Sequence, residues 1–263
     1  MTKTQQALAL EAAVEAAQAA GSLMRPNLHR TKKVNSTDIH DIKLDLDVRC
    51  QKLITRLLAK RLPHIPLLGE EGCDDSTEHA EQRWVVDPID GTVNFALGIP
   101  HAAVSIALQR RTSEGFVSEV GVTFDPFMDE LWTAVRGGKA RRNGQVIRVS
   151  SRKRLDQAVV SLGFPGGKKG LEVMIRDLGK LTHCVMKLRI MGSAALALAY
   201  VADGRFDAFV ETGLKLWDVA AGGLIVESAG GEFWSRPQPE LFHYSINANN
   251  GHLRSALEKV IRG

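Results

Sequence analysis

Two aspartates stand at the end of an apolar stretch in segment 84–95, WVVDPIDGTVNF. Asp87 and Asp90 would repel one another in an apolar setting, and each charge costs several kcal/mol to desolvate if it has no partner. The pair therefore lies in a solvated turn or beside something cationic. Gly91 and Thr92 follow directly, so amides at the start of a following helix can receive an anion. Taken alone, Gly91 also suits a turn and Thr92 a helix N-cap.

Further carboxylates adjoin apolar segments elsewhere in the chain. They are Asp41, Asp45 and Asp47 in DIKLDLD, Glu70 and Glu71 in GEEG, and Asp218 in LWDVAAGG. Each cluster alone is typical of a cap, a turn or a surface pair. Together they favour a divalent cation site, because Mg²⁺ and Mn²⁺ prefer carboxylate and carbonyl oxygens plus water. A metal beside an anion-receptive helix start indicates hydrolysis of a phosphate ester by metal-activated water.

Other chemistries find less support in the sequence. The histidines and cysteines have no zinc spacing, and no serine lies in a triad signature. Segment 163–170, GFPGGKKG, lacks the spacing of a phosphate-binding P-loop and is interpreted as a surface turn. Carboxylates delivered from separate strand ends therefore remain the best candidates for a site.

Alternating hydrophobic patterns predict the elements that position these side chains. Helices are predicted over 4–25, 45–63, 171–182, 191–204 and 216–231. Strands are predicted over 65–72, 83–90, 102–111, 115–126, 130–137, 158–165, 206–211, 231–234 and 243–249, with an Asn-Gly hairpin in 141–149. Groups of strands alternating with helices indicate a layered α/β (α+β) architecture. A soft boundary near residue 145 predicts two subdomains: 1–145, with the metal and phosphate motifs, and 146–263, which completes the site.

Composition narrows the class of protein. The chain has 263 residues, of which 44% are hydrophobic and 24% charged, which is ordinary for a globular protein. Its apolar runs are far shorter than the roughly 20 residues of a membrane span, and it opens without a secretion signal, so we expect a cytoplasmic protein with no membrane partner. The net charge is +4, with basic residues gathered in 136–154. That segment could contact nucleic acid, but a solvated hairpin face is favoured.

Taken in order, the motifs resemble the inositol monophosphatase family of magnesium-dependent, lithium-sensitive phosphatases. The matching segments are GEEG, WVVDPIDGTVNF, MGSAALALAYVADGRFDAFVE and LKLWDVAAGGLIVESAGG. They follow the family's order and spacing, the resemblance covers almost the whole chain, and DPIDGT followed by WDVAAGG is its most specific part. It implies an αβαβα sandwich of the sugar phosphatase type, usually a homodimer. It also implies two or three Mg²⁺ ions, with Mn²⁺ as a substitute and Li⁺ and Ca²⁺ as inhibitors.

The resemblance assigns roles to individual residues. As metal ligands it implies Glu70, Asp87, the carbonyl of Ile89, Asp90 and Asp218. As catalytic groups it implies Glu70 and the pair Asp47 and Thr92, which orients the attacking water. As substrate-binding residues it implies Gly91, Thr92, Gly192, Ser193, Ala194, Glu211, Lys215 and Asp218. Glu71 matches a partner of the metal-bound waters, and Arg189 an arginine near the pocket or the dimer interface.

Three positions depart from the family pattern. Leu44 replaces a threonine near Asp47, and Val93 replaces a second threonine after Thr92. Lys215 stands where animal inositol phosphatases often have histidine. A lysine beside Asp218 either favours a more anionic substrate or points to water.

The expected activity is hydrolysis of a small polyol or sugar phosphate, with inositol 1-phosphate preferred. Relatives on the same scaffold act on fructose 1,6-bisphosphate, histidinol phosphate or 3′-phosphoadenosine phosphates, and the mildly basic charge keeps these alternatives open. A different class of function is an RNA-associated regulatory protein that uses residues 136–154. It would bind nucleic acid in a salt-sensitive way that survives loss of the acidic site.

Overall fold

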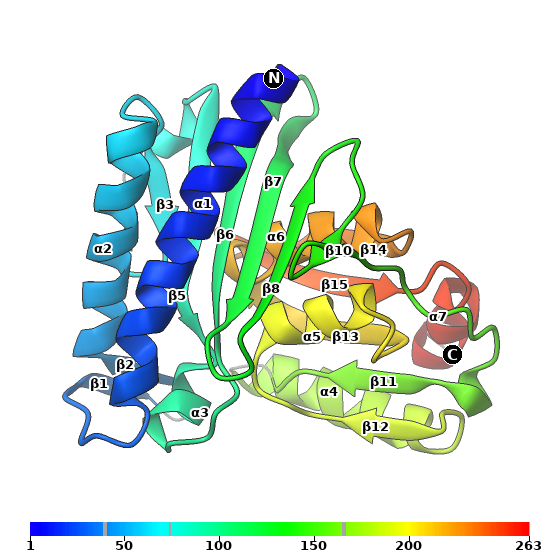
Figure 1. The fold of residues 1–263 in the computed structure, drawn as a ribbon. Coiled ribbons are helices and arrows are strands. Elements are labelled where there is room, and N and C mark those ends of the chain that lie inside the picture. Colours follow the sequence, from blue (N-terminus) through cyan, green and yellow to red (C-terminus); the bar gives the residue numbers. More distant parts are fainter. Residues whose placement is uncertain (39–40, 74, 165–166, 263) are drawn as a thin grey trace.

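Two β-sheets alternate with three layers of helices in the computed structural model, which describes residues 1–38, 41–73, 75–164 and 167–262 (Figure 1). The larger sheet has the strand order β10-β9-β8-β7-β6-β5-β3-β4. Its strands are β3 (Leu67–Gly69), β4 (Gly72–Cys73), β5 (Gln82–Asp90), β6 (Ala103–Thr112), β7 (Gly115–Asp125), β8 (Glu130–Val135), β9 (Arg141–Arg142) and β10 (Gln145–Val146). Apart from the parallel pair β3 and β5, its neighbours are antiparallel.

The outer face of this sheet is covered by α1 (Lys3–Met24) and α2 (Asp45–Arg61) (Figure 1). Helix α1 begins at a capping box in which Thr2 and Gln5 satisfy each other's backbone N–H groups. Its buried stripe consists largely of alanines, namely Ala9, Ala12, Ala13, Ala16, Ala17 and Ala20. Small side chains allow the helix axis to lie close to the sheet. A short hairpin, β1 (Val34–Asp38) with β2 (Asp41–Leu44), leads into α2.

The middle layer consists of α5 (Ala194–Ala202) and α6 (Leu216–Ser228), which lie between the two sheets (Figure 1). Helix α6 is apolar almost all round, as expected for a helix enclosed by sheets. It approaches β7 very closely, because a side chain at Gly121 would lie 2.7 Å from the carbonyl oxygen of Ala221. A short helix, α3 (Thr92–Ala96), follows β5 directly.

The smaller sheet has the order β12-β11-β13-β15-β14. Its strands are β11 (Val159–Leu162), β12 (Lys187–Arg189), β13 (Ala208–Lys215), β14 (Glu232–Pro237) and β15 (His243–Asn249). Its outer face carries α4 (Lys168–Thr182) and α7 (Arg254–Arg262) (Figure 1). Separate apolar cores fill the spaces between successive layers. The order helix, sheet, helix, sheet, helix is the predicted αβαβα sandwich, so the expected fold class is confirmed.

Most predicted elements occur close to their expected positions. The Asn-Gly hairpin is present as β9 and β10, with Asn143 and Gly144 at φ of 46° and 79°, the left-handed conformation that this turn requires. Strand β12 and the β1–β2 hairpin were not predicted, because each is short and gives a weak periodic signal. Helix α7 was also not predicted, although Leu257, Val260 and Ile261 follow helical spacing. Segment 163–170 includes residues outside the described part of the chain, and the boundary near 145 stays a prediction. Among the described residues, no helix is long and apolar enough to span a bilayer.

Candidate active site

Strand β5 ends at the two aspartates, and an irregularity there lets both approach the same site. Asp87 pairs with Ser105 of β6 and Asp90 with Ala103, so the register shifts between them. Residues three apart on a regular strand would point to opposite faces of the sheet. The backbone N–H of Ile89 donates to Asp87 Oδ1 over 2.9 Å, which closes a tight turn and fixes that carboxylate.

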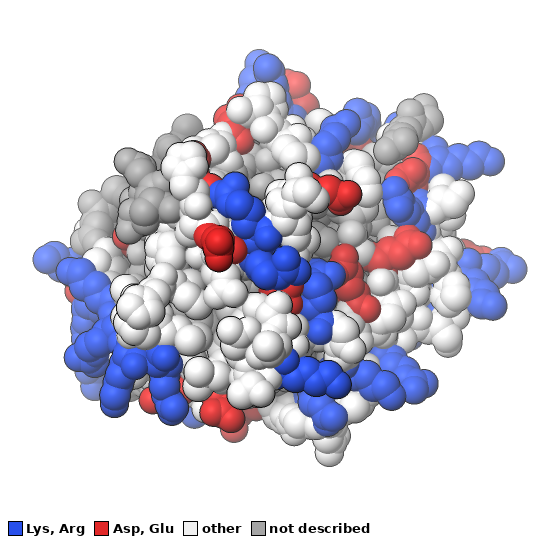
Figure 2. Space-filling view, turned by 90° about the horizontal axis from the view of Figure 1, so that it is seen from above, with Lys and Arg blue, Asp and Glu red and all other residues white. Residues whose placement is uncertain are grey.

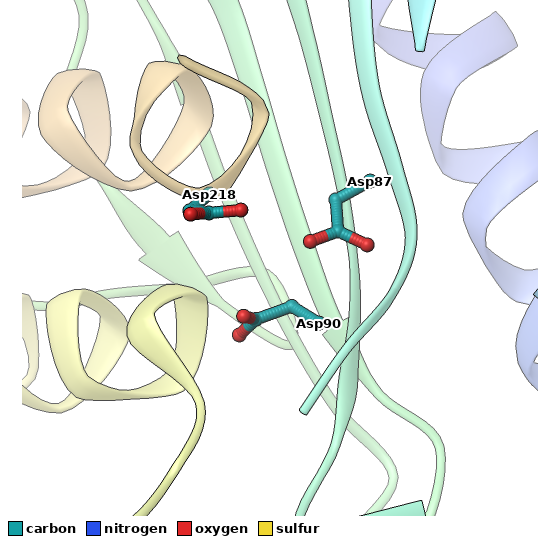
Figure 3. Close-up of side chains that lie close together, drawn as sticks. All are labelled: Asp87, Asp90 and Asp218. Atoms are coloured by element: carbon teal, nitrogen blue, oxygen red, sulfur yellow. The ribbon is translucent and has the colours of Figure 1, made fainter. Parts of the chain in front are cut away.

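The third aspartate comes from the start of α6. Asp218 is the third residue of the helix, and its Oδ2 accepts the backbone N–H of Lys215 over 2.7 Å. This local bond leaves the other carboxylate oxygen available to the site. Asp87, Asp90 and Asp218 each offer one oxygen, and these oxygens all lie within 4.8 Å of one another (Figure 3). Two segments that are remote in sequence therefore deliver one acidic cluster.

Asp90 is held by the first turn of α5. It accepts the side-chain hydroxyl of Ser193 and the backbone N–H groups of Ala194, over 3.3 Å, and Ala195, over 2.8 Å. The positive end of the helix dipole acts in the same direction. Ser193 and Ala194 thus fix a carboxylate as well as lining the cavity, a positioning role that the sequence did not reveal.

Asp47 and Thr92 are brought together as expected. Asp47 is the third residue of α2 and is buried; its Oδ2 accepts the Leu44 N–H over 3.0 Å. Its Oδ1 lies 3.3 Å from the Thr92 hydroxyl, which lies 2.8 Å from the carbonyl oxygen of Ile89. One hydroxyl proton faces two acceptors, so Thr92 can change its donor direction while its oxygen stays in place. Leu44 contributes a backbone group here, so the departure at that position leaves the anchor of Asp47 intact.

A cavity of about 580 Å³ joins these groups. The predicted site residues that line it are Glu70, Asp87, Ile89, Asp90, Gly91, Thr92, Gly192, Ser193, Ala194, Glu211 and Asp218. Asp47 reaches it through Thr92. Lys215 is not among the lining residues, and its contact with substrate stays a prediction.

Two glycines allow other groups of the site to approach the backbone closely. Gly91 has φ of 91°, and a side chain there would lie 2.9 Å from the carbonyl oxygen of His101. At Gly163 a side chain would overlap the carboxylate of Glu211, with 1.5 Å to Oε2. Gly163 is therefore required for Glu211 to face the cavity. This role could not be predicted from the sequence, because the contact joins the residue after β11 to β13.

Asn94 is a second residue that the sequence did not single out. Its side-chain amide donates to the carbonyl oxygens of His101, over 3.0 Å, and Met191, over 2.8 Å. It thereby ties the loop after α3 to the segment that leads into α5. Asn94 itself and Met191 both line the cavity.

Burial dominates the electrostatics of the cluster. Burial raises the pKa of Asp47 to about 7, against the opposing effect of its bonds to Leu44 and Thr92. Burial also raises the pKa of Asp87, and the negative charges of Glu70 and Asp90 raise it further. Burial raises the pKa of Glu211 to about 8, with a further increase from Asp90. Each shift reflects the cost of gathering like charges away from water.

The donor set fits hard divalent cations. Among the described residues that line the cavity, five are carboxylates and none is Lys, Arg or His. Carboxylates crowded together without basic side chains can all ionise only when a cation enters between them. Asp87, Asp90 and Asp218 are grouped as ligands of one ion would be, and Glu70 stands at the edge of the same cavity beside Asp87.

Comparison with known proteins places this geometry in a family. The sequence profile of the inositol monophosphatase family matches residues 5–262. An inositol-1-monophosphatase of Rhizobium meliloti is 43% identical over 222 residues, covering 82% of this chain and 81% of that protein. A protein of Escherichia coli K12 named Nus factor SuhB is 39% identical over 225 residues, covering 84% and 83% of the two chains.

Solved structures of related proteins have the same fold as this chain. The extragenic suppressor protein SuhB of Bartonella henselae superposes with a TM-score of 0.87 at 36% identity, over 96% of this chain and 97% of the other. An inositol monophosphatase of Thermotoga maritima gives a TM-score of 0.85 at 30% identity, over 96% of each chain. The family hydrolyses phosphate monoesters and depends on metal ions, in agreement with the acidic cavity. This chain belongs to the inositol monophosphatase family and is a phosphatase of phosphate monoesters.

Proposed function

We propose that the protein is a Mg²⁺-dependent phosphomonoesterase whose preferred substrate is inositol 1-phosphate. The convergence of Asp87, Asp90 and Asp218 at one end of a 580 Å³ cavity carries this proposal. The cavity is large enough for a phosphorylated six-membered ring, and Glu211 lines the same space. The name of the Rhizobium relative supports the choice of substrate.

The three aspartates, with Glu70 and the carbonyl oxygen of Ile89, would hold two or three ions. Bound Mg²⁺ supplies charge stabilisation for the phosphate and lowers the pKa of water. The Thr92 hydroxyl orients the attacking water, with Asp47 Oδ1 as an acceptor for the proton on Thr92 Oγ1. The backbone amides of Gly91 and Thr92 receive phosphate oxygens. Glu211 hydrogen-bonds a substrate hydroxyl, and its raised pKa lets it donate as well as accept near neutral pH.

The test is phosphate release by protein stripped with EDTA and then supplied with Mg²⁺. We expect activity only with Mg²⁺ or Mn²⁺, inhibition by Li⁺ and Ca²⁺, and a loss of at least 10²-fold in kcat for Asp90→Asn. A matched control is Asp156→Asn, an exposed aspartate that pairs with Arg154 outside the site. Unchanged turnover by Asp90→Asn would remove the proposal.

A substrate panel decides among the alternatives. It should compare inositol 1-phosphate with fructose 1,6-bisphosphate, histidinol phosphate and 3′-phosphoadenosine 5′-phosphate by kcat/KM. Lys215→Ala tests whether the lysine favours the more anionic substrates. If it does, the variant loses kcat/KM selectively for the bisphosphates.

Nucleic-acid binding is a second candidate, favoured by the relatives named Nus factor. Half of the eight basic side chains in segment 136–154 are nevertheless paired with acidic groups. Its ion pairs join Arg136 to Glu227, Arg142 to Asp203, Arg152 to Asp207 and Arg154 to Asp156. Figure 2 shows acidic side chains standing among basic ones across the middle of one face. RNA binding measured by fluorescence anisotropy should therefore be weak and should disappear as salt is raised.

A homodimer is the assembly we propose. Three apolar side chains are exposed in segments that adjoin residues of the cavity wall, Leu97 (70%), Ile99 (45%) and Ile190 (44%). Asn94 ties the loop that carries the first two to the segment after Ile190. Light scattering after size exclusion should give twice the chain mass, and Leu97→Glu with Ile190→Glu should give the monomer.

A further inference from the structure

A second cavity, of about 350 Å³, lies against α6 where the two sheets approach one another. Helix α6 contributes the stripe Leu216, Val219, Ala220, Gly223, Leu224 and Glu227, which does not include Asp218. Strands β5, β6, β7, β14 and β15 supply the rest of the wall. No residue lines both this cavity and the phosphatase cavity, so the two spaces are distinct.

The cavity contains a buried guanidinium with spare donors. Arg83 of β5 is only 5% exposed. Its Nε donates to Gln109 Oε1 over 3.0 Å, and its Cζ lies 3.7 Å from the ring centroid of Phe116. In the described part of the chain, its two Nη nitrogens have no hydrogen-bond acceptor, and no carboxylate lies within ion-pairing distance. The group is therefore held in place while the four N–H donors on its Nη nitrogens remain unused.

The charges around the cavity leave one net positive charge. Arg136 also lines it, but its Nη2 pairs with Glu227 over 3.4 Å and its Nε donates to the carbonyl oxygen of Ser118. Arg111 stacks on the same Phe116 ring at 4.6 Å and adds to the positive potential. Burial lowers the pKa of Arg83 to about 10, with smaller opposing effects from Tyr244 and the exposed Glu78, so the guanidinium stays charged at neutral pH. A buried cation without a counterion is costly, and a bound anion would compensate it.

The remaining wall matches an organic anion rather than a bare inorganic one. Phe116, Phe233 and the apolar stripe of α6 surround the guanidinium. Tyr244 also lines the cavity, and a phenolic hydroxyl can donate a hydrogen bond to a ligand. A planar carboxylate can accept two parallel bonds from a guanidinium, and its apolar body would cover the aromatic rings.

We propose that this cavity is a binding site for a small organic monocarboxylate, separate from the phosphatase site. The carboxylate pairs with the free Nη donors of Arg83 and accepts a hydrogen bond from Tyr244. The apolar part of the ligand lies against Phe233 and α6. The single net charge of the site matches a monoanion better than a doubly charged phosphate monoester.

The test uses benzoate as the probe and its neutral isostere benzamide as the control, with the Mg²⁺-loaded full chain and calorimetric titration. We expect benzoate to bind at least tenfold more tightly than benzamide. Arg83→Gln should weaken benzoate binding at least tenfold, and Tyr244→Phe several-fold. Arg111→Gln, which lies outside the cavity, should change it less than twofold.

Two further variants test whether benzoate occupies the phosphatase site instead, and whether the loss of binding in Arg83→Gln reflects misfolding. Asp90→Asn should bind benzoate as the unaltered protein does, which shows that the probe does not occupy the phosphatase site. If Arg83→Gln fails to fold, Ser235→Trp replaces it, because this exposed residue on the rim would fill the cavity and abolish binding. Equal affinity for benzamide, or full binding of benzoate by Ser235→Trp, would overturn the proposal.

Discussion

Individual side chains in this protein combine structural and chemical roles through the two oxygens of a carboxylate. Asp47 and Asp218 are each the third residue of a helix, and each uses Oδ2 to accept the N–H of the residue before that helix. The second oxygen is then presented in a fixed direction, towards Thr92 in one case and towards the aspartate cluster in the other. Asp90 is fixed by the start of α5 in a comparable way. Capping thus orients the acidic groups before any ion binds.

Asp47 makes metal-free stability depend on pH. Its pKa is raised from 3.8 to about 7, so the folded state keeps a proton that the unfolded state releases in this range. Stability contributed by the protonated group is therefore present below about pH 4, falls as pH rises towards 7 and is level above it. Asp47→Asn should remove on the order of 2 to 4 kcal/mol of this pH dependence.

Urea unfolding in EDTA between pH 5 and 8 measures that effect. Glu114→Gln, at an exposed turn, serves as the control and should keep the full slope. An identical slope in Asp47→Asn and the unaltered protein would show that the carboxylate is already ionised in the fold.

At the scale of elements, α6 must lie very close to β7 for Asp218 to meet Asp87 and Asp90. Gly121 permits this approach, because a Cβ atom at this position would lie only 2.7 Å from the Ala221 carbonyl oxygen. Neither partner can move easily, because both are backbone atoms within a packed layer. The position of the third aspartate therefore depends on a glycine in a different element.

Gly121→Ala should lower the free energy of unfolding by about 1 to 3 kcal/mol and reduce Mg²⁺ affinity, because overpacking displaces α6. The matched substitution is Gly179→Ala in α4, where a side chain would meet no atom within 4 Å. That change should stabilise the protein by about 0.5 to 1 kcal/mol, since alanine favours helix. Denaturant unfolding compares the two. If Gly121→Ala and Gly179→Ala changed the free energy of unfolding equally, the contact at Gly121 would be shown to relax without cost.

At the scale of the whole molecule, the site lies where the two halves of the chain meet. The larger sheet supplies Asp87 and Asp90, α6 supplies Asp218, and the smaller sheet supplies Glu211. Ions bound there would hold the sheets and the central helices together. Binding to the folded state alone stabilises it by mass action.

Mg²⁺ should therefore raise the melting temperature of the whole protein in one transition. At a hundred times the dissociation constant, the gain is about 2.7 kcal/mol. Differential scanning calorimetry with and without Mg²⁺ measures the shift, and Asp218→Asn should abolish most of it. A shift confined to one of two separate transitions would show instead that the halves unfold independently.

The sequence by itself determined the fold class, most of the elements and the identity of the acidic residues. These follow from local periodicity and from motifs such as DPIDGT and WDVAAGG, whose residue types report directly on chemistry. The three-residue strand β12 escaped prediction, because its pattern is too brief to outweigh competing interpretations.

Only the tertiary structure decided how the carboxylates are held and what else surrounds them. Three contacts join residues from different elements. Ser193 supports Asp90, Gly163 leaves space for Glu211, and Gln109 holds Arg83. Such contacts depend on how layers pack in three dimensions, and one-dimensional periodicity carries no information about the distance between separate segments.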